Sequence, residues 1–198
     1  RSEMYEQPNF YWAQENFLRE LQQGKAWHWT ILRPVLIVGE AMGGAMDLIP
    51  PLGVYAAMLR EEGRPLDYPG GAARVSQAVD VDLLARAIGW AGEADAARNE
   101  AFNVTNGDVF TWENVWPAIS DALGMKPGNA VPLALAQEYP DWIAPWDDLR
   151  RKHDLVSPGL EAFVGLSFQY ADYCLRYGQT QSGPPSIVST VKINQAGF

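Results

Sequence analysis

The stretch NFYWAQENFL, residues 9–18, places Tyr11 at the start of a helical pattern and Glu15 four residues later. A phenol in such a position can donate a hydrogen bond to an oxygen on which negative charge develops during a reaction. Tyr-x-x-x-Lys is a catalytic pattern in many reductases, and Glu15 stands where its lysine would be. Tyr11 is therefore either a catalytic tyrosine without that lysine or an ordinary aromatic residue on a helix.

Other residue types that commonly carry chemistry are sparse. The segment GEAMGG, residues 39–44, matches neither a dinucleotide fingerprint nor a P-loop, and no lysine follows it. We interpret it as a glycine-rich turn near a ligand. His28 and His153 are the only histidines, and no cysteine or acidic residue stands at metal-ligand spacing around His28. The sequence therefore predicts no metal site.

The composition excludes several classes of partner. Lys and Arg number 15 against 24 Asp and Glu, which argues against binding to nucleic acid or to an anionic lipid surface. No apolar run approaches the roughly 20 residues that span a bilayer, and no secretory signal pattern opens the chain. Cys174 is the single cysteine, so no internal disulfide can form. These features favour a cytoplasmic protein without a membrane anchor.

The elements that would position Tyr11 follow from hydrophobic periodicity. Residues 9–23 predict an amphipathic helix that ends at Gly24. Trp27, Trp29 and Ile31 alternate with polar residues, and a nearly continuous apolar run follows from Leu32. This is typical of a strand buried on both faces in a parallel sheet, and Pro34 should end its regular ladder. A second short strand at 99–107 and helices elsewhere predict an α/β fold with few strands. So few strands indicate the second half of a larger fold.

Four segments together resemble a known family. They are NFYWAQENFL, the pattern W-x-I-L-R-P-x-x-I-x-G from Trp29 to Gly39, VYAAMLREEG at residues 54–63, and NEAFNVTNGDVFTWENVWP from Asn99 to Pro117. The chain is similar here to the progesterone 5β-reductase and iridoid synthase-like reductases, which are atypical extended short-chain dehydrogenases. The resemblance implies the C-terminal part of an extended Rossmann fold plus a mostly helical substrate-binding subdomain. Residues 1–40 would end the Rossmann domain and 41–198 would be mainly the subdomain, with 99–107 returning to the sheet.

The resemblance also implies an activity, namely NADPH-dependent reduction of C=C bonds in enones or enals, or of carbonyls. Tyr11 falls on the family's catalytic tyrosine, and the family itself lacks the lysine at the position of Glu15. Pro34 and Ile37 would lie beside the nicotinamide of NADPH. The residues expected to line the pocket for a small hydrophobic carbonyl substrate are Trp12, Met46, Leu48, Ile49 and Tyr55, although core packing is an equally open reading for the last four.

The sequence departs from the family in lacking the glycine-rich phosphate loop and the strands that precede the tyrosine helix. An apolar strand without its sheet neighbours invites association. We therefore expect a homo-oligomer or a complementing N-terminal polypeptide. Two alternatives stay open at this point. The chain could be a non-catalytic binding or oligomerisation module, or an extended-family epimerase or dehydratase, although those enzymes usually keep the lysine.

Overall fold

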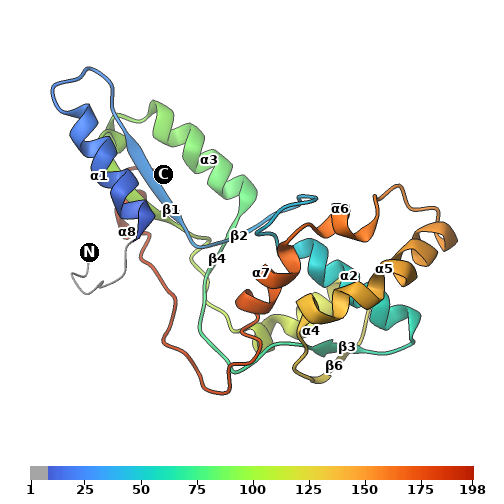
Figure 1. Cartoon of the computed structure of the whole chain (residues 1–198). Coiled ribbons are helices and arrows are strands. Elements are labelled where there is room, and N and C mark those ends of the chain that lie inside the picture. The colour runs from blue at the N-terminus through green and yellow to red at the C-terminus, as the bar shows by residue number, and fades with distance from the viewer. Residues whose placement is uncertain (1–8) are drawn as a thin grey trace.

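The computed structural model describes residues 9–198. Its helices and strands form two lobes, each with its own buried cluster of apolar side chains (Figure 1). We call them the sheet lobe and the helical lobe. The fold is α/β with few strands and several helices, and the paired strands run parallel, as the sequence predicts.

The sheet lobe begins with α1 (Phe10–Gln22), which Asn9 caps by accepting a hydrogen bond from the backbone N–H of Tyr11 at 3.0 Å. Strand β1 (Thr30–Pro34) follows and pairs in parallel with β5 (Glu100–Val104). The ladder of β1 ends at Pro34, which has no backbone N–H to donate. The chain then resumes as β2 (Leu36–Val38), which pairs with β4 (Ala78–Asp80).

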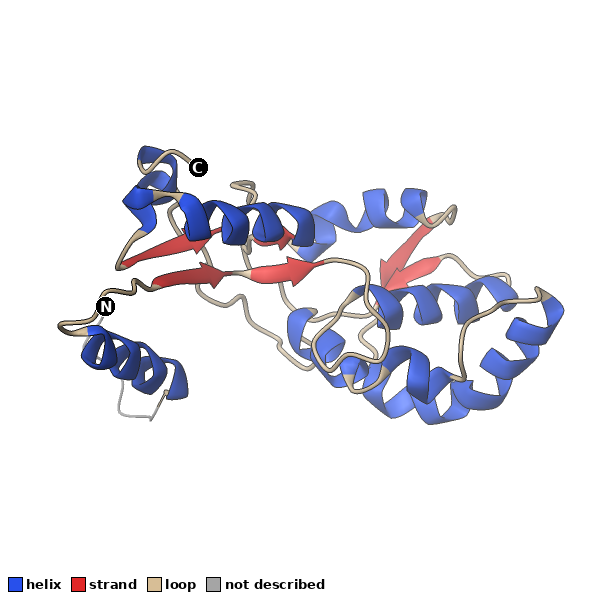
Figure 2. Ribbon diagram, turned by 90° about the horizontal axis from the view of Figure 1, so that it is seen from above, coloured by secondary structure: helices blue, strands red, loops and turns tan. Residues whose placement is uncertain are grey.

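Helices cover both faces of β1. Figure 2 shows α1 on one side of the strands and α3 (Val81–Glu93) on the other. Asp80 caps α3 by accepting from the N–H groups of residues 82 and 83. The lobe is completed by a 3-10 turn (Asp95–Ala97) and by α8 (Val191–Gln195). Its buried core comprises Val79, Ala87, Ala97, Phe102, Val104 and Ile193.

One edge of β1 is open. Within residues 9–198, β5 is the only strand paired with β1, so the opposite row of backbone groups has no strand beside it. An edge strand of this kind presents a row of backbone N–H and C=O groups with which another strand can pair.

The helical lobe contains α2 (Ile49–Glu61), α4 (Trp112–Ala122), α5 (Leu135–Lys152), α6 (Leu160–Val164) and α7 (Ser167–Cys174). A short parallel pair, β3 (Leu66–Tyr68) and β6 (Pro127–Ala130), crosses beneath them. Aromatic side chains fill this core, and the indole N–H of Trp116 donates to the carbonyl of Leu66 at 3.0 Å. The many tryptophans of the sequence are largely structural here.

The lobes are not consecutive segments of the chain. Residues 78–104 and the last residues, 191–198, pack in the sheet lobe, and they include most of the segment 99–107 that we expected to return to the sheet. The physical reason is that a parallel strand such as β5 can join β1 only through a crossover, and α3 is that crossover. The chain therefore passes between the lobes several times.

Candidate functional site

Tyr11 lies in the first turn of α1 with 60% of its surface exposed. Its ring packs on that of Phe10, with 4.1 Å between the centroids. It lines a cavity of about 600 Å³, the tyrosine cavity, formed between α1 and β1. Trp12 and Pro34 line the same cavity. The phenol thus lies within reach of the carboxyl end of β1, the end at which parallel sheets bind ligands.

Glu15 has a structural role that the sequence does not reveal. Its side chain is buried, and its two carboxylate oxygens accept from Nε and Nη2 of Arg33 at 2.9 and 2.6 Å. Arg19 lies 3.7 Å from the same carboxylate and places its guanidinium 4.3 Å from the ring centre of Trp29. The residue at the lysine position therefore holds α1 against β1.

Pro34 lines both the tyrosine cavity and a second one between the lobes. This interlobe cavity, of about 390 Å³, is lined by Pro34 to Leu36, Met46, Arg74, Ser76, Gln77, Trp112, and residues of α7 and the chain after it. Tyr170, Tyr173 and Cys174 of α7 face it. Burial raises the pKa of the Cys174 thiol to about 11, and burial likewise raises the pKa of Tyr170 well above its ordinary value. Both groups are therefore protonated at neutral pH.

The remaining expected site residues are dispersed. Ile37 of β2 is 39% exposed, and Met46 borders the interlobe cavity. Ile49 faces a different cavity, between α2, α5 and α6. The structure places Leu48 and Tyr55 elsewhere: both are packed in the core of the helical lobe, where the phenol of Tyr55 donates to the carbonyl of Asp67 at 3.1 Å. Helix α2 turns these two side chains inward because they lie on its apolar face.

Several residues at the interlobe cavity were not among our expected site residues. They are Arg74, Arg176, Tyr170 and Tyr173, which come from two segments about a hundred positions apart in the chain. No local motif joins those segments. Only the packing of α7 beside the extended segment 74–77 brings them together.

The glycine-rich segment 39–44 is engaged with the helical lobe. The N–H of Gly43 donates to the carbonyl of Phe163 at 2.8 Å. The carbonyl of Gly44 accepts from the N–H of Leu166 and from the hydroxyl of Ser167. The N–H of Gly43 and the carbonyl of Gly44 thus fix this turn against α6 and α7.

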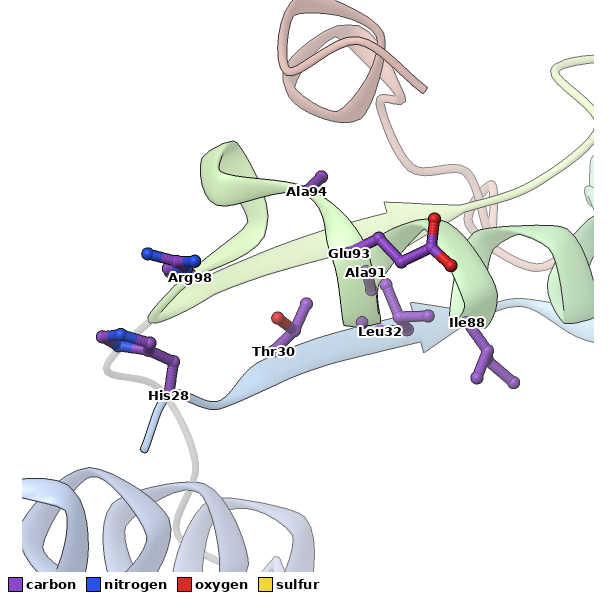
Figure 3. A pocket seen from close by; sticks show the side chains of 9 residues that line it. His28, Thr30, Leu32, Ile88, Ala91, Glu93, Ala94 and Arg98 are labelled. Atoms are coloured by element: carbon purple, nitrogen blue, oxygen red, sulfur yellow. The ribbon is translucent and has the colours of Figure 1, made fainter. Parts of the chain in front are cut away.

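A further cavity, of about 610 Å³, lies along the open edge of β1, between this strand and α3. Figure 3 shows Thr30 and Leu32 of β1 on one side of it and Ile88 and Ala91 of α3 on the other. Together with the tyrosine cavity, it leaves space on both faces of β1 at the same edge.

Two other findings concern the described part of the chain. None of its helices is long and apolar enough to cross a membrane. Across the same residues, no group of three or more His, Cys, Asp or Glu side chains is arranged to hold a metal ion.

These features define the class: the sheet-edge portion of a Rossmann-type α/β protein with an attached helical lobe and a cavity between them. Residues 2–174 match the family described as PRISE-like Rossmann-fold domain, and the chain belongs to that family.

Its relatives include (S)-8-oxocitronellyl enol synthases. The one from Antirrhinum majus is 34% identical over 183 residues, covering 88% of this chain and 46% of the relative. The CYC2 enzyme of Camptotheca acuminata is 34% identical over 176 residues, covering 85% of this chain and 45% of that protein. The chain thus spans less than half the length of these relatives.

A solved structure shares the fold at low sequence identity. It is the UDP-N-acetylglucosamine 4-epimerase from Methanobrevibacter ruminantium M1 in complex with UDP-N-acetylmuramic acid, with a TM-score of 0.53 and 15% identity. The alignment covers 94% of this chain and 45% of the epimerase. The similarity extends over both lobes.

Proposed function

We propose that this chain is the C-terminal, substrate-binding part of an NADPH-dependent reductase that acts on C=C bonds of enones or enals, or on carbonyls. The observation that carries the proposal is the shared cavity of Tyr11 and Pro34 at the carboxyl end of β1. The names of the curated relatives, enzymes of 8-oxocitronellyl enol formation, support the same class of carbonyl substrate.

Tyr11 is the group that we assign to catalysis. Its phenol O–H would donate a hydrogen bond to the substrate's carbonyl oxygen, where negative charge accumulates during reduction. Glu15 is not assigned a role in proton transfer to the phenol, because both of its carboxylate oxygens accept hydrogen bonds from Arg33. Trp12 and Met46 would line the substrate's path between the tyrosine and interlobe cavities.

The described residues fit one end of the cofactor. Pro34 and Ile37 are exposed where β1 ends and β2 runs, and they would lie against the nicotinamide. Bound NADPH supplies a hydride. We do not assign the pyrophosphate to the glycine-rich segment 39–44, because its spacing fits neither phosphate-binding motif and the Gly43 N–H is bonded to the helical lobe. The pyrophosphate would be held by residues outside the described part of the chain.

The open edge of β1 indicates how the site would be completed. We propose that a complementing N-terminal polypeptide, or a second copy of the chain, covers this edge. Apolar side chains exposed on α1 add to the uncovered surface, with Phe10 at 63%, Phe17 at 61% and Leu21 at 49% exposure. An acidic chain with one cysteine suits the reducing cytoplasm, where we place this assembly.

The test is a titration of NADPH into the chain, followed by nucleotide fluorescence, with the intact mass measured on the same sample. We would repeat it with the N-terminal half of the Antirrhinum majus relative present, and then add 2-cyclohexen-1-one as a neutral enone. Saturable binding and enone-dependent oxidation of NADPH in either sample support the proposal. Failure to bind NADPH or reduce the enone in both samples, with complex formation shown by mass, would overturn it.

A further inference from the structure

The interlobe cavity has an unusual charge distribution. Its lining includes two arginines, Arg74 and Arg176, and no aspartate or glutamate. The whole chain carries a formal net charge of −9. Arg33, Arg64 and Arg150 each form an ion pair with an acidic side chain. Arg176 donates to two backbone carbonyls, and the lining of this cavity offers Arg74 no acidic partner.

Arg74 is the less satisfied of the two. Its Nε is buried and has no hydrogen-bond partner, and within residues 9–198 its guanidinium makes no ion pair. A buried donor without a partner costs free energy, since the group has lost its water. The flat fork of a guanidinium is well suited to a carboxylate or a phosphate. Arg74 lines the cavity, and its guanidinium is therefore the group there that could bind an anion.

Arg176 is held in place at an energetic cost to the backbone. It follows the last turn of α7 with φ of 62°, a conformation in which glycine is the usual residue. Its Nε donates to the carbonyl of Ala72 and its Nη2 to the carbonyl of Gln181, both at 2.9 Å. The arginine at this strained position places a positive charge beside the segment that carries Arg74.

We infer that the interlobe cavity contains an anion-binding subsite, with Arg74 as its direct contact and Arg176 as a positioning residue, and that the substrate of this protein carries a carboxylate or phosphate group in addition to its reducible carbonyl. The inference rests on the proposed function, because it names the substrate class of that site. Pro34 lines both this cavity and the one with Tyr11, so the two cavities are neighbours. Nonspecific anion binding is disfavoured by the net negative charge.

The test uses the ¹⁵N-labelled chain and follows the side-chain Nε–Hε resonance of Arg74. Levulinate, which carries a ketone and a carboxylate, is titrated beside methyl levulinate, which has the same ketone and no charge. We expect a saturable shift with levulinate and binding weaker by at least about tenfold with the ester. Equal binding of ester and acid, or no shift with any anion, overturns the inference.

Inorganic phosphate is titrated as a third ligand, which shows whether the subsite prefers a carboxylate or a phosphoryl group. A shift with levulinate alone assigns the subsite to a carboxylate, and a shift with phosphate alone assigns it to a phosphoryl group. Arg74→Gln should abolish the shift of backbone amides around the cavity, and Arg74→Lys should restore part of the affinity. Arg86→Gln, on the exposed face of α3, is the matched control and should bind as the parent does.

The Arg74→Gln chain is expected to fold, because no partner of the Nε is left unsatisfied by the change. Undiminished anion binding in that variant overturns the inference, and the acid-against-ester comparison in the parent chain decides independently of any variant. The titration contains no nicotinamide and no reaction. Its failure therefore leaves the reductase proposal standing, whereas failure to reduce a neutral enone removes the reducible carbonyl from the inference and leaves the anion-binding subsite standing.

Discussion

The carboxylate of Glu15 meets the guanidinium of Arg33 in a two-point contact, with N···O distances of 2.9 and 2.6 Å, across the joint between α1 and β1. Glu15 is the more buried partner, with its side chain 10% exposed against 42% for Arg33. The pair therefore fixes the position and rotation of α1, the helix that carries Tyr11, relative to β1. A lysine at this position would face Arg33 and Arg19 instead of supporting the phenol.

We accordingly predict that Glu15→Lys does not create a better catalytic site. The change buries a cation beside two arginines, so the free energy of unfolding should fall by at least about 3 kcal/mol. Denaturant unfolding measures the effect. Glu20→Lys, at an exposed position of the same helix, should change stability by no more than about 0.5 kcal/mol. Equal stability of the two variants would contradict a structural role for Glu15.

Tyr11→Phe should lower the rate of enone reduction in the completed assembly by roughly 100- to 1000-fold, because one oxyanion donor is lost. Its effect on stability should be small, since the ring is 60% exposed. Steady-state kinetics with NADPH in excess measures the change. Tyr177→Phe, at a surface turn after α7, is the control and should retain the parent rate. A Tyr11→Phe variant with the full rate would remove Tyr11 from catalysis.

Gly165 fixes the glycine-rich segment against the helical lobe, and we predict that alanine is not tolerated there. Its φ is 61°, and a Cβ would lie 2.5 Å from the carbonyl oxygen of Gly44. Backbone strain and overpacking together should cost roughly 2–5 kcal/mol in thermal or denaturant unfolding. Gly53→Ala, inside α2 with open space around it, should instead stabilise by about 0.5–1 kcal/mol. Similar effects of the two changes would refute this reading.

Cys174 should be an unreactive thiol. Burial raises its pKa to about 11, so at pH 8 alkylation by iodoacetamide should be roughly 100-fold or more slower than in the urea-unfolded chain. Because the folded pKa lies above the unfolded one, the folded chain holds the proton more tightly. The contribution of this group to stability therefore declines as pH rises from about 8.5 toward 11. A native alkylation rate equal to the unfolded one would contradict this.

The local features of the sheet lobe could be read from the sequence. Hydrophobic periodicity predicts α1, an apolar run predicts a parallel strand, and the missing N–H of Pro34 predicts where the ladder of β1 ends. These features depend on residues that are close together in the sequence, so short sequence patterns are enough to predict them. The family resemblance rests on the same local segments and is confirmed by the match over residues 2–174.

Contacts between distant segments were decided only by the tertiary structure. Glu15 and Arg33 are 18 positions apart, and nothing in either local pattern shows that one neutralises the other. Leu48 and Tyr55 look equally suited to a pocket or a core, and the packing of α2 places them in the core. The interlobe cavity joins Arg74 to Arg176 across about a hundred residues of chain. The sequence by itself determines which side chains are present and which local elements they form. Which distant side chains meet at one cavity depends on how the two lobes pack against each other.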